Sequence, residues 1–419
     1  MRYITKKTDK NEYLPLVDLS KKPYAPVADT EYLYSYAVVD NESGYLGHPD
    51  SVLLRNGNIL TLYPEGHGKG KILSKISTDG GKTYTETLKN PPKSWESSLE
   101  TPTIYRLQFK NGDEKLIVIS GNPQWRGVYT PGGFNCSISS DEGENWTEFQ
   151  RFFDRESDFT VFPIVAMASL TRLKADGEFA DVWMGLFHDK NYVNYKTLLT
   201  FNEKGEMCWS KPEPYLKKYR RIERFAGICE VEAVRSEGGE GDEICLIARS
   251  NKKRCESLVI TSQDEGKTWS YPTPVPAGLN GERHKAEYLP DGRLFITFRS
   301  IELDKQHRFI KNISWKSLGW TAWVGPYSAL KGESTGDFRI KIAHTYLPEQ
   351  TEPEPFANAD TGYCGNCVLP DGTVVTCSYG IFSPEEKEEG VYVTDKGRQK
   401  RKTFIASKRI KIEDIEKLL

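Results

Sequence analysis

The chain has 419 residues, and 57 Lys and Arg stand against 59 Asp and Glu, so its formal charge at pH 7 is −2. This balance gives no reason to expect nucleic acid or a membrane surface as a partner. No apolar run approaches the ~20 residues that a bilayer span needs, and the first ten residues lack the apolar core of a secretory signal. We therefore expect a cytoplasmic protein, or a secreted one if a signal has been removed.

The two ends of the chain differ from its middle. Residues 1–30 are polar and interrupted by prolines, which predicts an irregular N-terminal segment. Residues 31–39 then form an apolar and aromatic run that predicts a strand. At the other end, residues 403–419 predict a strand followed by a short helix.

Six strand–turn–strand units follow one another along the chain. Turn pairs such as Asn56-Gly57 and Asp291-Gly292 separate their apolar runs, which predicts β-hairpins. The hairpins lie at residues 52–63, 108–117, 173–177, 234–247, 288–296 and 368–375. If the hairpins surround one axis, the first strand of each carries side chains to that axis.

An eight-residue pattern of Ser, any, Asp, any, Gly, any, any, aromatic starts at Ser77, Ser139 and Ser262. In such a box the Asp accepts hydrogen bonds from backbone N–H groups of a turn, the Gly takes a positive φ, and the aromatic packs onto the sheet. The starts are 62 and 123 residues apart, so a copy is missing near 200. Residues 201–209 predict a degenerate copy there, and the run containing Trp320 and Trp323 predicts a decayed one.

These boxes resemble the Asp-box repeats of the sialidase superfamily, and a period of about 60 residues suits a four-stranded propeller blade. The resemblance implies an all-β fold: a single β-propeller domain over 1–419. We expect six blades, or seven if the terminal strands form a blade of their own. The strand at 31–39 is expected to close the ring by pairing in the last blade.

Eight cysteines are spread over strand-like segments without a disulfide framework, which predicts free, buried thiols. Cys364 and Cys367 have the spacing of a metal or redox pair. Because no second such pair or nearby His accompanies them, we interpret them as two blade cysteines.

Sialidases hold the substrate carboxylate with three arginines and use a Tyr/Glu pair as the nucleophile. By resemblance, Glu230 and Arg249 lie on the segment that carries the Glu and the second arginine, and Tyr363 lies near the Tyr position. His48-Pro49-Asp50 stands where the first arginine is expected. A missing bidentate arginine argues against orthodox sialidase chemistry.

The residues at this end of the repeats resemble a different group, the propeller polysaccharide lyases. His48 and His67 in the first repeat, with Tyr105 and Arg126 in the second, are similar to the catalytic His, His, Tyr and Arg of L-rhamnose-α-1,4-D-glucuronate lyases and ulvan lyases. The matching end of the fifth repeat adds Arg283 and His284 as candidate substrate contacts. Together with Glu230, Arg249 and Tyr363 they complete the expected substrate-binding set.

The chemistry of β-elimination accounts for these residue types. The C5 proton of a uronate becomes acidic when a cation such as Arg126 neutralises the adjacent carboxylate. A neutral His48 can then take that proton, and a His or Tyr can assist the leaving oxygen. His67 could instead ligate a cation or contact the sugar.

We therefore predict an enzyme that cleaves a glycosidic linkage of an acidic oligosaccharide or polysaccharide, first by elimination and second by sialidase-like or rhamnosidase-like hydrolysis. A non-catalytic, glycan-binding propeller is the third alternative. No cofactor is expected to be required, although a structural divalent cation such as calcium fits the fold.

Overall fold

The computed structural model describes residues 14–124, 129–303, 315–347, 356–382, 391–393 and 399–419. Strands make up 46% of the chain and helices 9%. The chain divides into two compact units, which we describe separately. The central unit consists mainly of Leu88–Val275. The terminal unit consists mainly of the chain up to Gly68, Leu73–Thr87 and Pro276–Leu419.

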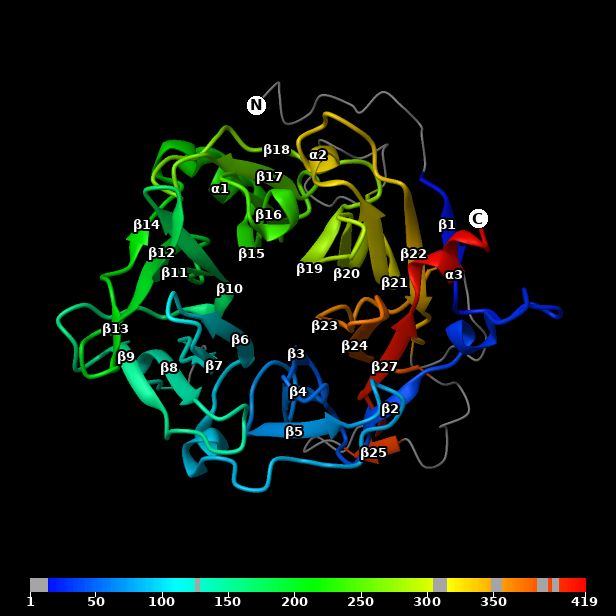
Figure 1. Ribbon diagram of the computed structural model, residues 1–419, viewed down its shortest axis with the longest axis horizontal. Coiled ribbons are helices and arrows are strands. Elements are labelled where there is room, and N and C mark those ends of the chain that lie inside the picture. The colour runs from blue at the N-terminus through cyan, green and yellow to red at the C-terminus, as the bar shows by residue number, and fades with distance from the viewer. Residues whose placement is uncertain (1–13, 125–128, 304–314, 348–355, 383–390, 394–398) are drawn as a thin grey trace. The chain divides into compact units, whose positions relative to one another are not determined.

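The central unit holds three antiparallel sheets, which follow one another along the chain (Figure 1). The first contains β6 (Thr103–Gln108), β7 (Glu114–Gly121), β8 (Gly132–Ser139) and β9 (Gln150–Asp154). The second contains β10 (Ile164–Ala175), β11 (Glu178–His188), β12 (Asn194–Phe201), β13 (Met207–Trp209) and β14 (Glu213–Pro214). The third contains β15 (Ile228–Arg235), β16 (Ile244–Ser250), β17 (Leu258–Ser262) and β18 (Thr273–Pro274).

The terminal unit holds three further blade sheets. One contains β3 (Asp50–Leu53), β4 (Ile59–Pro64) and β5 (Ile72–Ser77). The next contains β19 (Gly281–Tyr288), β20 (Leu294–Leu303), β21 (Trp315–Gly325), β22 (Phe338–Ala343) and β1 (Leu16–Asp18). The last contains β23 (Gly365–Val368), β24 (Val374–Gly380), β27 (Phe404–Ile410) and β2 (Ala37–Asp40), and β25 (Val391–Val393) pairs with β26 (Gln399–Arg401) as a separate ribbon.

Helices are short among the described residues. The α-helices are α1 (Arg220–Ala226), α2 (Tyr327–Leu330) and α3 (Ile412–Glu416). The 3₁₀ helices are η1 (Glu31–Tyr34), η2 (Lys93–Ser97), η3 (Lys217–Tyr219) and η4 (Glu237–Gly239). None of the described helices is long and apolar enough to cross a membrane.

The three box sequences form the turns that their residues predict. Asp79 Oδ1 accepts the N–H of Thr83 at 2.9 Å, and Asp141 and Asp264 bond the N–H four residues ahead in the same way. Gly81, Gly143 and Gly266 have φ of 83°, 87° and 75°, which only glycine adopts freely. Each turn follows the third strand of its sheet, and the turn at 202–206 is the degenerate copy expected near 200.

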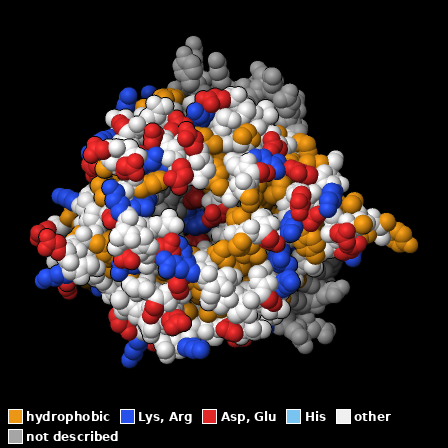
Figure 2. Space-filling model, viewed as in Figure 1, with side chains coloured by type: hydrophobic (Ala, Val, Ile, Leu, Met, Phe, Trp, Pro, Cys, Tyr) orange, Lys and Arg blue, Asp and Glu red, His pale blue; other side chains and the backbone are white. Residues whose placement is uncertain are grey.

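Apolar strand faces supply a core in each unit. In the central unit, Leu246 and Ile260 are fully buried and pack among residues of neighbouring strands. In the terminal unit, Trp320 and Phe338 occupy the same kind of position. Strands such as β8 and β24 are buried along their whole length, so both of their faces pack against protein. Figure 2 shows how charged and apolar side chains are distributed over one face of the surface.

The all-β, six-bladed propeller predicted from the repeats is confirmed, and all six predicted hairpins form. The closing pair is β2 with β27, so the terminal strands belong to the last blade and not to a seventh. Three details differ from expectation. Residues 31–34 are 3₁₀ helix, residues 16–18 form a strand, and Trp320 and Trp323 lie inside β21, whose turn to β22 holds α2 and not a box.

All eight cysteines are free, as predicted. Six of them are buried, whereas Cys255 is half-buried and Cys208 is exposed. Cys364 and Cys367 flank the start of β23, and burial raises the pKa of the Cys364 thiol to about 12. A thiol with so high a pKa is a poor nucleophile, which agrees with a structural role.

Candidate functional site

Four side chains near the starts of inner strands sit on left-handed backbone. His48, Val165, Glu230 and Arg283 have φ of 54°, 49°, 48° and 52°. The last three coincide with register shifts in β10, β15 and β19, where each strand bulges. A non-glycine residue in this region costs on the order of 1–3 kcal/mol, and such strain concentrates at functional sites. The bulges therefore change the direction in which side chains near the starts of these strands point.

In the terminal unit, His48 is the centre of an aromatic group that we call the histidine cluster: His48, His67, Tyr363 and Tyr379. The His48 ring centroid lies 4.3 Å from that of Tyr363, 4.9 Å from that of His67, and 4.7 Å from the ring of Tyr379, on which it stacks. His48 Nε2 lies 3.4 Å from the Tyr379 hydroxyl. His48 is only 5% exposed, so the surrounding rings fix its orientation.

Arg299, in the middle of β20, connects the histidine cluster to a carboxylate. Its Nη2 donates to the Tyr379 hydroxyl at 3.1 Å, and its Nη1 donates to Glu282 Oε2 at 2.8 Å. Its guanidinium carbon lies 5.7 Å from the centroid of the Tyr363 ring, and that of Arg283 lies 6.0 Å from it. Two cations thus lie against the tyrosines that pack on the buried imidazole.

The cluster reaches solvent on the side of His67, whose side chain is 63% exposed. The hydroxyl of Tyr45 bonds His67 Nδ1 and donates to Asp360 at 3.0 Å. Burial, followed by the nearby Tyr379 and Asp360, raises the pKa of Tyr45 far above its ordinary value. Tyr45 therefore stays protonated and holds His67 in place.

A buried ion pair holds the segment that carries His48. Lys285 Nζ lies 3.2 Å from Asp50 Oδ1, and both side chains are at least nine-tenths buried. Asp50 also accepts the N–H of Ser51 at 3.0 Å. The strained backbone at His48 is thus anchored two residues downstream by a contact from β19.

The central unit holds a second polar group, in which Arg249 Nη1 donates to both carboxylate oxygens of Glu230 at 2.7 Å. Arg249 Nη2 donates to Asn251, and Asn251 donates to the Tyr192 hydroxyl. His188 lies beside this pair, and burial lowers the pKa of His188 to about 4. Its imidazole is therefore neutral at physiological pH.

Glu100 is another buried acidic residue of the central unit and is 2% exposed. It is bonded by the backbone N–H groups of Ala166, Thr101 and Val165, yet burial outweighs these bonds and raises the pKa of Glu100 to about 8. Its Oε2 has no hydrogen-bond partner among the described residues. Glu100 is thus a protonated carboxyl group that also supports the bulge at Val165.

The sequence-predicted residues fall into three groups. His48, His67, Tyr363 and Arg283 come together in the terminal unit, and Glu230 pairs with Arg249 in the central unit. His284 is fully buried against Phe298, and Tyr105 donates its hydroxyl to the Met167 carbonyl of the next sheet. These contacts place neither residue in the histidine cluster. The predicted catalytic Arg126 lies outside the described residues.

Four residues of these groups escape the sequence reasoning: Tyr379, Arg299, Glu282 and Glu100. A signal for Arg299 was present, because Phe298-Arg299-Ser300 repeats the pattern of Ala248-Arg249-Ser250 one blade later. No local pattern marks Tyr379 or Glu100. Among the described residues, no three His, Cys, Asp or Glu side chains gather in a way that could hold a metal ion.

The profile of the BNR repeat-like domain family matches residues 64–330, and the chain belongs to that family. The sialidase-superfamily prediction is thereby confirmed for the repeats and the fold. No curated protein matches the sequence.

Solved structures with the same fold are distant in sequence. An α-L-arabinofuranosidase of Fusarium graminearum, solved with arabinobiose, is 12% identical with a TM-score of 0.56, over 91% of this chain and 98% of that one. The NanB sialidase of Streptococcus pneumoniae is 13% identical with a TM-score of 0.54, over 93% and 72%. A Dyadobacter fermentans protein of unknown function is 15% identical with a TM-score of 0.55, over 89% and 97%. At these identities the likeness establishes the fold alone.

Proposed function

We propose that this protein cleaves a glycosidic linkage in an oligosaccharide or polysaccharide that carries acidic sugar units, and that it does so by β-elimination. The observation that carries the proposal is the connected path from Arg299 through the Tyr379 hydroxyl to His48 Nε2. Two of the similar folds are those of a sialidase and an α-L-arabinofuranosidase, which supports a carbohydrate substrate.

Elimination requires a base, a positive charge and a proton donor, and we assign these roles to the histidine cluster and the two arginines beside it. His48 removes the C5 proton of the uronate, the C5–H electrons form the C4–C5 double bond, and the C4–O bond breaks. Arg283 and Arg299 supply positive charge near the developing carbanion and carboxylate. The leaving oxygen receives a proton from a neighbouring hydroxyl, for which Tyr363 is the candidate because its ring lies against His48.

Product analysis tests this proposal directly. The protein is incubated with rhamnosyl-glucuronate glycans and separately with sialosides, and ultraviolet absorbance and mass spectrometry follow the products. We expect an unsaturated uronate from the first substrate and little release of sialic acid from the second. Saturated products from every glycan that is cleaved would overturn elimination.

Hydrolysis is the second candidate, and the central unit supplies the observation that favours it. Glu230 is ion-paired with Arg249, whereas burial raises the pKa of Glu100 to about 8. Two carboxyl groups whose protonation states differ are the usual requirement of a glycoside hydrolase. Under this alternative, Glu230→Gln abolishes cleavage while His48→Gln retains it, and the product is a saturated sugar.

A further inference from the structure

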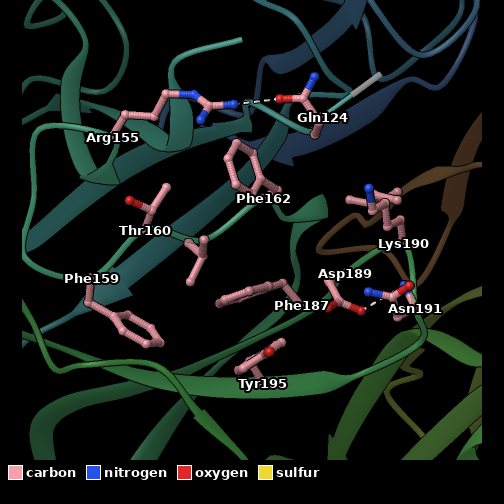
Figure 3. A pocket seen from close by; sticks show the side chains of 12 residues that line it. Gln124, Arg155, Phe159, Thr160, Phe162, Phe187, Asp189, Lys190, Asn191 and Tyr195 are labelled. Carbon is pink, nitrogen blue, oxygen red and sulfur yellow. Dashed lines mark hydrogen bonds between the residues drawn. The ribbon is translucent and has the colours of Figure 1, made fainter. Parts of the chain in front are cut away.

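The central unit contains a pocket of about 250 Å³ that neither proposed reaction uses. Figure 3 shows it between the segment that follows β9 and the connection from β11 to β12. Ring faces occupy its middle, and polar side chains lie at its edges. It is lined in part by Arg155, Phe162, Phe187, Asp189, Lys190 and Tyr195.

One wall of the pocket is a pair of parallel rings. Phe187 and Tyr195 face each other across β11 and β12, with centroids 5.3 Å apart and planes 16° apart. Phe162 adds a third ring, and the guanidinium carbon of Arg155 lies 4.8 Å from its centroid. Flat aromatic faces of this kind pack against the C–H face of a sugar ring, while polar groups at the edge bond its hydroxyls.

The polar edge of the pocket favours an anion. Its described lining holds two cations, Arg155 and Lys190, and one carboxylate, Asp189. Asp189 Oδ1 is already occupied, because it accepts the N–H groups of Asn191 and Val193 at 2.8 Å and 2.9 Å. Lys190 lines the pocket and is exposed, so a ligand carboxylate can reach its ammonium group.

The pocket shares strand β11 with the polar group around Glu230. Successive side chains of a strand point to opposite faces. On β11, Phe187 lines the pocket, while the next residue, His188, stacks parallel to Tyr192 and is electrostatically coupled to Glu230. The pocket therefore lies on the opposite face of β11 from His188 and its neighbour Glu230.

We propose that this pocket is a subsite that binds one uronate unit of a glycan, with the sugar ring on the aromatic wall and its carboxylate toward Lys190. The ligand class rests on the proposed function, because the uronate belongs to the same acidic glycan. The subsite is separate from the histidine cluster and makes no covalent step.

Binding of D-glucuronate and D-glucose to the full chain, measured by calorimetry or ligand-detected NMR, tests the subsite without turnover. We expect D-glucuronate to bind about fivefold more tightly than D-glucose, because one partly exposed ion pair forms. Lys190→Ala removes this preference, and Phe162→Ala weakens binding of both sugars about tenfold. Phe179→Ala is the matched control, because Phe179 is a half-buried ring that does not line the pocket and lies at the opposite end of β11 from Phe187.

The outcomes separate the subsite from the catalytic proposal. Loss of binding in Phe162→Ala with retention in Phe179→Ala supports the subsite, even if no glycan is ever cleaved. Equal affinity for the two sugars, or equal losses in the two variants, overturns it. If D-glucuronate does not bind while elimination proceeds normally, the subsite is wrong and the proposed function stands.

Discussion

Two blades, one in each unit, build the same Glu–Arg pair and use it differently. In the β15–β16 blade, Arg249 donates hydrogen bonds to Glu230 and Asn251, and Asn251 donates to the Tyr192 hydroxyl. In the β19–β20 blade, Arg299 donates hydrogen bonds to Glu282 and to the Tyr379 hydroxyl, which in turn lies within hydrogen-bond distance of His48 Nε2. In both blades the carboxylate lies at the bulge in the first strand, and the arginine lies on the second strand opposite that bulge.

The difference lies in what surrounds each pair. Beside Glu230 lie His188, whose pKa burial lowers to about 4, and Glu100, whose pKa burial raises to about 8, so both neighbours are neutral near pH 7. Beside Glu282 and Arg299 lies a cluster that reaches solvent through His67. The same Glu–Arg pair of the repeat therefore belongs to a buried network in one blade and to a candidate reaction centre in the other.

Truncation of the imidazole is the strongest way to test this distinction. We expect His48→Ala to lower kcat by roughly 10²–10⁴-fold, the usual effect of removing a general base, with little change in substrate affinity. Turnover is measured with a uronate glycan, and thermal unfolding verifies that the variant is folded. Near-normal kcat in a folded His48→Ala protein would show that His48 is not the base and that the histidine cluster is not the reaction centre.

Removal of the carboxylate in the other blade is expected to affect stability most. Glu230→Ala leaves the guanidinium of Arg249 without its partner at a site where both side chains are largely buried, which costs about 3–5 kcal/mol of unfolding free energy. Urea denaturation measures the loss. Glu203→Ala, at an exposed carboxylate in the β12–β13 turn, is the control and should change stability by less than about 0.5 kcal/mol.

The protonated Glu100 predicts a pH dependence of stability. In the unfolded chain this carboxyl group ionises near its ordinary pKa of 4.5, whereas in the folded protein it keeps its proton until about pH 8. The stabilising contribution is therefore fully present below about pH 4.5 and is lost as the pH rises through about 8. Glu100→Gln, which stays neutral, should lose less stability than wild type between pH 5 and 8, and parallel pH profiles of the two proteins would show that Glu100 is ionised.

The hydroxyl that joins Arg299 to His48 should have the smallest effect. Tyr379→Phe removes one hydrogen-bonded group while keeping the ring that stacks on His48. A loss of about 1–2 kcal/mol, or roughly tenfold in kcat, is expected with an unchanged KM. If KM rises instead and kcat is unchanged, Tyr379 contacts substrate and does not position His48.

The features that the sequence predicted correctly are those determined by interactions between residues close together in the chain. The Asn56-Gly57 turn and the box aspartates act on neighbouring backbone, so the sequence specifies them locally. Glu230 and Arg249 were found together because one hairpin carries both. The link from Arg299 to Tyr379 joins residues 80 positions apart, and nothing local indicates it.

Residue type alone also misplaced two candidates. Tyr105 and His284 have the right chemistry and lie on inner strands, but their side chains bond the backbone carbonyls of Met167 and Leu279. The strand register decides which face a side chain takes, and a bulge shifts that register by a residue or more. The sequence does not reveal the bulges at Arg283 and Glu230. The usual alternation of side chains between the two sheet faces therefore could not predict which way the neighbouring side chains point.

Substrate deuterated at C5 of the uronate tests most directly whether His48 abstracts a proton in an elimination. The rates for deuterated and ordinary glycan are compared under saturating conditions, and the product is identified by absorbance and mass. We expect wild type to turn over the deuterated glycan more slowly, with a product that carries a C4–C5 double bond and no deuterium at C5. Equal rates together with a saturated product that retains the deuterium would contradict it.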